Sequence, residues 1–209
     1  AAAWFGHRRG GLAYATMGGC AAFGAVCGSS TATAATFAKA ALPEMLRRGY
    51  SPAFSTGTIA AGGTLKALIP PSIVMILYCV VTKTFIFDLF YAAIVPALLA
   101  LLLNLLAIAL VVRWKPELAP LSDPVASAEK WLALRDAAPV LVLMLAVFLG
   151  LYSGVFTVNE AASVAAVLAL VFALLRGRLD WPSVWLGLRE TASATAMIYT
   201  IIIGASVFS

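Results

Sequence analysis

The chain has 209 residues, of which 63% are hydrophobic and only 11% are charged, and its mean hydropathy is +1.00. Soluble domains carry about 25% charged residues, so this composition excludes an ordinary soluble protein and indicates an all-α, polytopic (multi-pass) membrane protein. A net charge of +5 would suggest a nucleic-acid partner in a soluble chain, but here the basic residues lie between apolar runs, as in the loops of membrane proteins. We therefore expect a lipid bilayer around the chain and no nucleic acid.

The uncharged stretch of residues 10–38 predicts two short helices rather than one long one. As a single straight helix it would span about 43 Å, well beyond a hydrocarbon core of about 30 Å. In its middle, Gly28-Ser29-Ser30-Thr31-Ala32-Thr33 has the glycine and hydroxyl side chains that favour turns and caps. We expect a re-entrant hairpin over residues 10–48. The basic pairs Arg8-Arg9 and Arg47-Arg48 place both of its ends on the cytoplasmic side.

A second stretch of small residues, Ala53–Thr64, leads to two consecutive prolines. Pro70 and Pro71 remove two backbone donors and clash with the preceding turn, so a helix cannot continue unbroken through them. We expect a broken helix over residues 53–82, with a first half that ends near Gly62 and a second half that begins at Pro71. Carbonyl groups freed at such a break are good ligands for a hard cation, and the N-termini of half-helices favour anions.

The remainder of the chain predicts further spanning helices. The apolar runs are Leu89–Val112, Ala137–Asn159, Glu160–Leu175 and a last run that begins near Thr191. The loops Arg113–Asp136 and Arg176–Arg189 hold seven of the 14 basic residues, which places both loops inside the cell. Because the chain ends within an apolar run and does not begin with methionine, we expect a segment of a longer protein, incomplete at both ends.

Two groups of residues are candidates for a site, and each has a structural alternative. The hydroxyls of residues 29–33 suit an ion cradle at the tip of the hairpin, or ordinary packing between helices. Ile69-Pro70-Pro71-Ser72, which follows Gly62-Gly63-Thr64, suits a site at the helix break, or only a kink.

Two charged residues and one histidine carry open interpretations. Lys66 could hold an anionic substrate, take by its charge the place of a cation, or extend to the membrane interface. Glu160 is expected to cap the returning helix, with a proton-carrying role as the alternative. His7 lies beside two arginines and has no catalytic partner, so neither hydrolysis nor redox chemistry is indicated.

Five segments in order resemble the large membrane subunit of TRAP transporters, the tripartite ATP-independent periplasmic uptake systems. They are Gly6-His7-Arg8-Arg9-Gly10-Gly11-Leu12, Gly28-Ser29-Ser30, Met45 to Phe54, Ala60 to Ser72, and Gly154-Val155-Phe156-Thr157 with Glu160-Ala161-Ala162. This sequence departs from the family at Lys66, where a glycine is common.

The resemblance implies a sodium-driven secondary transporter in the bacterial inner membrane, which imports an organic anion delivered by a periplasmic substrate-binding protein. A small four-helix membrane subunit, separate or fused, would be its partner, and no cofactor is needed. The implied fold has two inverted repeats, each with a re-entrant hairpin and a broken helix, and an elevator-like moving domain. Residues 1–85 would be the transport part of the first repeat. Residues 86–209 would be scaffold helices and the start of the second repeat.

The resemblance also implies the ligands. Sodium would be held by side-chain or backbone oxygens of Ser29, Ser30, Thr33, Lys66, Ile69 and Pro71. The substrate would contact Gly28, Ser29, Gly63, Thr64, Pro70 and Ser72.

Three other classes of protein fit the same residues. One is a dicarboxylate or citrate symporter that works without a binding protein. Another is a non-transporting scaffold subunit, in which the glycine and serine tip is packing only. An intramembrane enzyme ranks last because no catalytic pairing is present, and we expect no enzyme activity.

Overall fold

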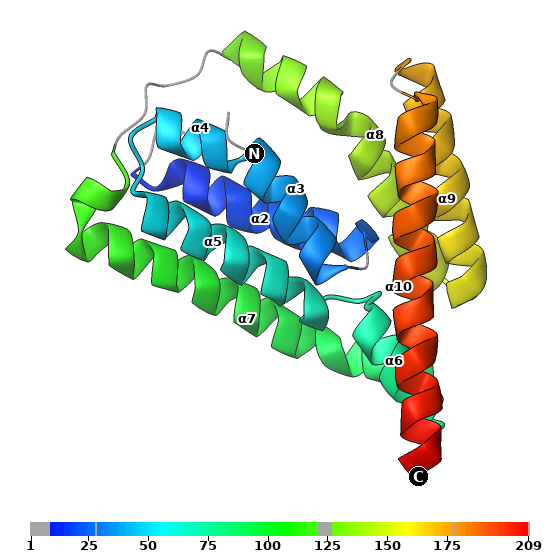
Figure 1. Cartoon of the computed structure of the whole chain (residues 1–209). Helices are drawn as coiled ribbons and strands as arrows, with labels where there is room; N and C mark the ends of the chain where they lie inside the picture. The colour runs from blue at the N-terminus through cyan, green and yellow to red at the C-terminus, as the bar shows by residue number, and fades with distance from the viewer. Residues whose placement is uncertain (1–8, 28, 121–126, 178, 209) are drawn as a thin grey trace.

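We describe the chain from a computed structural model, which describes residues 9–27, 29–120, 127–177 and 179–208. The described residues form helices joined by short links and contain no strand, which confirms the predicted all-α class (Figure 1). The helices are α2 (Gly11–Cys27), α3 (Ser30–Ala40), α4 (Leu42–Arg47), α5 (Pro52–Leu65), α6 (Ile73–Thr82), α7 (Ile86–Trp114), α8 (Ser127–Tyr152), α9 (Val158–Leu175) and α10 (Trp181–Phe208), with 3-10 turns at Lys66–Leu68 and Pro116–Leu118. His7, Arg8 and Gly28 lie outside the described residues.

Helices α2 and α3 fold back on one another and form a helical hairpin (Figure 1). The rings of Phe23 in α2 and Phe37 in α3 meet edge to face, with centroids 6.0 Å apart. Helix α3 begins after Ser29, which has extended backbone angles and whose hydroxyl accepts a hydrogen bond from the Ala32 amide. The reversal therefore falls where hydroxyl side chains can cap the new helix.

The chain after the hairpin forms two helical halves with an irregular link between them. Helix α5 continues to Leu65, three residues past the end expected near Gly62, and a 3-10 turn extends it to Leu68. Ile69 and Ser72 have extended backbone angles, the Pro70–Pro71 bond is cis, and α6 starts at Ile73 rather than at Pro71.

Three helical segments among the described residues are long and apolar enough to cross a membrane: Pro52–Thr82, Ile86–Trp114 and Val158–Leu175. Ala138–Tyr152 is a shorter apolar stretch within α8. The predictions of loops over residues 113–136 and 176–189 are wrong in part, because both segments contain helix. Helix α8 already begins at Ser127, and α10 begins at Trp181, ten residues before the expected start near Thr191. Charged residues near a span do not end a helix. A charge keeps a residue out of the lipid core, but it does not prevent helical backbone.

Glu160 caps the start of α9, as the sequence predicts. Its carboxylate accepts hydrogen bonds from the backbone amide and the hydroxyl of Thr157, each at 2.8 Å. The Thr157 hydroxyl in turn accepts from the Glu160 amide, which completes a capping box.

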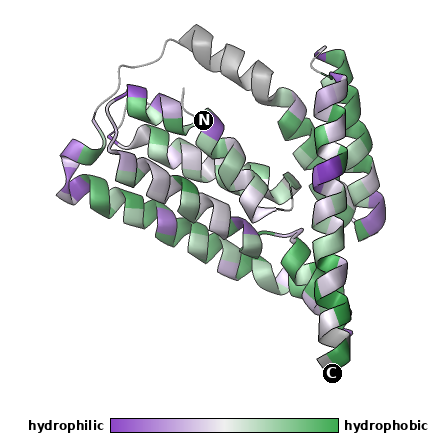
Figure 2. Cartoon of the chain, viewed as in Figure 1, coloured by the Kyte–Doolittle hydropathy of each residue, from purple (hydrophilic) through white to green (hydrophobic). Residues whose placement is uncertain are grey.

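The helices enclose two apolar cores, and many large apolar side chains are exposed on their outer faces. Hydrophobic residues occur along most of the ribbon (Figure 2). The first core joins α2, α4, α5 and α7, and the second joins α6, α7, α8 and α9. On α7, Val95 is 72% exposed and Leu102 is 61% exposed. Apolar side chains exposed along a whole helix indicate a surface that faces lipid or a partner helix.

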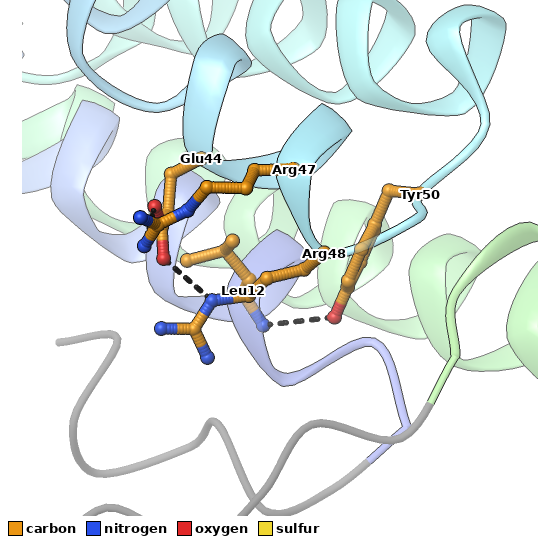
Figure 3. A network of polar contacts seen from close by, with 5 residues as sticks. All are labelled: Leu12, Glu44, Arg47, Arg48 and Tyr50. Carbon is orange, nitrogen blue, oxygen red and sulfur yellow. Dashed lines mark hydrogen bonds and ion pairs between the residues drawn. The ribbon is translucent and has the colours of Figure 1, made fainter.

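Two ion pairs at α4 and one hydrogen bond between Tyr50 and the start of α2 lie at the far end of the hairpin (Figure 3). The Arg48 side chain donates to the Glu44 carboxylate at 2.6 Å, and Arg47 forms a second ion pair with it at 2.7 Å. The Tyr50 hydroxyl accepts a hydrogen bond from the Leu12 amide at 3.3 Å.

Glu44→Gln should lower stability near neutral pH and have no effect in acid. Hydrogen bonds from Arg48 and Arg47 hold the pKa of Glu44 below its ordinary 4.5, so the carboxylate stabilises the fold above that pH. The stabilisation disappears as pH falls through the lowered pKa. We expect the variant to lose about 1 kcal/mol or less at pH 7 and to converge with wild type in acid. Thermal unfolding of the full-length protein in detergent from pH 3 to pH 7 measures this; parallel curves would contradict it.

Candidate ion and substrate site

Helix α5 approaches the hairpin so closely that only glycine fits at the contacts. A Cβ added at Gly62 would lie 2.7 Å from Cys20 Cβ in α2. A Cβ added at Gly63 would lie 2.8 Å from Ala34 Cβ and 3.3 Å from the Ser30 backbone oxygen, both in α3. Small residues permit this approach of helix backbones. The end of α5 is therefore wedged between the two arms of the hairpin, next to its tip.

Lys66 follows this contact and is the most unusual residue of the region. Its side chain is 0% exposed, although it carries an ammonium group. The Nζ atom donates hydrogen bonds to the carbonyl oxygens of Ile69, at 2.9 Å, and Pro71, at 2.6 Å. The expectation that it extends to the interface therefore does not fit this geometry. The ammonium closes back on the link that interrupts the helix.

The hairpin leaves room for the stem of this lysine. A Cβ at Gly24 in α2 would lie 2.8 Å from Lys66 Cδ and 3.0 Å from Lys66 Cβ. Among the described residues, the ion pairs that form are those of Glu44 with Arg47 and Arg48, so no carboxylate pairs with Lys66. Two backbone carbonyls stabilise its charge instead, that of Ile69 at the end of the 3-10 turn and that of Pro71 in the link.

The hydroxyls of Ser29, Thr31 and Thr33 at the hairpin tip form local hydrogen bonds. The Ser29 hydroxyl lies 3.1 Å from the Thr31 hydroxyl and accepts from the Ala32 amide at 3.3 Å. The Thr33 hydroxyl is buried and donates to the Ser29 carbonyl at 2.8 Å. Within the described part of the chain, no hydrogen bond joins these hydroxyls to residues 69–72. The tip and the link instead meet through the contacts of Gly63 with α3 and of Lys66 with α2.

The predicted substrate residues lie in different surroundings. Pro70 and Ser72 are buried in the link, and Ser72 is the N-cap of α6. Gly63 is buried against α3. Thr64 is exposed, and its hydroxyl donates to the Ala61 carbonyl of its own helix at 2.9 Å. The structure therefore groups the link with Gly63 and turns Thr64 outward.

A pocket of about 510 Å³ opens beside the link, between α2, α7 and α8. Its walls are apolar, and Tyr152 is the only lining residue with a polar side-chain group among the described residues. Such a lining suits an apolar side chain or a lipid tail better than a carboxylate.

Sequence reasoning missed Gly24, Cys20 and Ala34, which shape the region from the hairpin side. The available signal was the spacing of Cys20 and Gly24, four residues apart and so on one face of α2. That pattern predicts a close helix contact but does not say with which helix.

This architecture is that of a multi-pass helical membrane protein with an interrupted helix. A family profile described as "Tripartite ATP-independent periplasmic transporter, DctM component" matches residues 1–209. The chain is 42% identical to the C4-dicarboxylate TRAP transporter large permease protein DctM of Pseudomonas aeruginosa, over 98% of this chain and 48% of the relative. It is 35% identical to the DctM protein of Rhodobacter capsulatus, over 100% of this chain and 50% of the relative. It is 36% identical to the ectoine/5-hydroxyectoine TRAP transporter large permease protein UehC of Ruegeria pomeroyi, over 99% of this chain and 48% of the relative.

The chain belongs to the DctM family of TRAP transporter large permeases and is a multi-pass bacterial membrane protein. It spans about half the length of the curated relatives that it matches. These relatives are named as transporter permease components and not as enzymes.

Proposed function

We propose that the full protein is the large permease subunit of a sodium-driven transporter that imports an organic anion across the bacterial inner membrane. The observation that carries the proposal is the family match along the entire chain. The interrupted helix supports it, because carbonyls in the link between α5 and α6 already hold a positive group. In this proposal a periplasmic binding protein delivers the substrate, and a small membrane subunit completes the complex.

We place the substrate near the hairpin tip and the link, as the resemblance implies. Helices α3 and α6 both begin there, with Ser29 and Ser72 as their N-caps, and helix N-termini favour a carboxylate. Sodium would bind the oxygen atoms of Ser29, Ser30 and Thr33 at the tip. A carboxylate substrate agrees with the C4-dicarboxylates in the names of two relatives. We further propose that residues 1–85 form the transport part of the first repeat, with a re-entrant hairpin. This part would move by an elevator mechanism against residues 86–209.

Uptake by proteoliposomes tests this proposal. The full-length permease, its small subunit and its cognate binding protein would be reconstituted, and labelled succinate would be the probe. We expect uptake that requires both an inward sodium gradient and the binding protein. Uptake without the binding protein would identify a symporter of the other class, and no uptake would support a scaffold subunit. Unchanged uptake in a Ser29→Ala, Ser30→Ala double variant would exclude the tip hydroxyls as ligands.

A further inference from the structure

Lys66 is a buried cation bound by the atoms that a broken helix offers to a metal ion. Its Nζ lies 2.9 Å from the Ile69 carbonyl and 2.6 Å from the Pro71 carbonyl. Backbone carbonyls freed by a helix break are the typical ligands of a transported alkali cation. An ammonium group has the same single positive charge and donates hydrogen bonds to the same kind of oxygen atom.

The surroundings of the side chain fit a lysine. Gly24 of α2 leaves the space that the lysine stem fills, and a methyl group there would collide with Lys66 Cδ at 2.8 Å. In the described residues, no ion pair neutralises the ammonium, since both ion pairs involve Glu44. The positive charge therefore depends on carbonyl dipoles, as that of a bound sodium ion would.

We propose that the Lys66 ammonium takes the place of a sodium ion at the helix break, so that this permease carries its own fixed cation there. This inference rests on the proposed function in that sodium is the coupling ion. A sodium ion on the same two carbonyls would lie about 4 Å from the ammonium. With the effective dielectric constant of about 20 that describes protein sites, repulsion at that distance weakens binding by about three orders of magnitude. The tip oxygens and the part of the protein outside this chain are then left to bind the transported sodium.

The test counts sodium ions bound to the purified full-length transporter complex in detergent. The probe is radioactive sodium in equilibrium dialysis, with choline chloride to keep the ionic strength constant. Lys66→Gly removes the charge and the stem, and we expect it to bind one more sodium ion per complex than wild type does. Lys66→Met also removes the charge but retains most of the stem beside Gly24, and we expect it to gain the same ion, because repulsion by the ammonium is what keeps sodium from the two carbonyls. Equal numbers of bound sodium ions in wild type and Lys66→Gly would overturn the inference.

A measurement on wild type decides the question even where Lys66→Gly does not fold. Hydrogen exchange of the backbone amides in residues 66–76 would be compared in sodium chloride and choline chloride, without substrate. We expect equal exchange, and slower exchange in sodium confined to this segment would overturn the inference.

The two proposals fail separately. Uptake that ignores the sodium gradient overturns sodium coupling, whatever the number of ions bound to Lys66→Gly. Sodium-driven uptake together with an unchanged ion count in Lys66→Gly overturns only the role of the lysine.

Discussion

Lys66→Met should destabilise the full-length protein by about 2–3 kcal/mol, because the carbonyls of Ile69 and Pro71 lose a charged donor in a buried place. The substitution keeps much of the apolar stem against Gly24, so the loss reports mainly on the ammonium. The destabilisation should appear as a lower Tm. Thermal unfolding of the purified protein in detergent measures it.

The control for this experiment is Lys39→Met. Lys39 is exposed in the last turn of α3. Its replacement should change stability by no more than about 0.5 kcal/mol. Similar Tm values for Lys66→Met and wild type would show that the two carbonyls find other donors, and that the ammonium does not hold the link together.

Gly63→Ala should separate α5 from the hairpin. The new methyl group would lie 2.8 Å from Ala34 Cβ and 3.4 Å from Ala34 Cα, and neither atom belongs to a flexible side chain. One of the two helices must therefore shift, and overpacking of this kind costs about 1–3 kcal/mol. The measurements are the Tm and, for the reconstituted transporter, the initial rate of uptake, and we expect both to fall.

Gly57→Ala in the same helix is the matched control, because an added Cβ there meets nothing within 4 Å. Alanine is the better helix former by about 1 kcal/mol, so this variant should be neutral or more stable than wild type. The two substitutions are chemically identical and should change stability in opposite directions. A stabilising effect at Gly63 would contradict the close contact between α5 and α3.

Much of the fold follows from local sequence. Apolar runs predict the helices because each span must satisfy its own backbone hydrogen bonds in lipid. The double proline marks the interruption, and Thr157 with Glu160 marks the start of α9, since both are effects of residues on their own backbone.

The boundaries and the place of Lys66 depend on partners far away in the chain. Gly62 and Gly63 do not end α5, because Cys20 and Ala34 pack directly against them and hold the helix together. The position of the Lys66 ammonium depends on the space beside Gly24, on another helix. Residues 181–189 are helical although the basic residues within 176–189 predict a loop, because a charge keeps a residue out of the lipid core but does not prevent helical backbone. Periodicity and propensity contain none of this information.

The glycine contacts of α5 restrict how this region can move. Helices that slide past each other need a layer of side chains that can change rotamer, and at Gly62 and Gly63 no such layer exists. The two arms of the hairpin and the first half of the broken helix should therefore travel as one rigid block. Residues 69–72, which lie outside any regular helix, are the place left for the chain to bend.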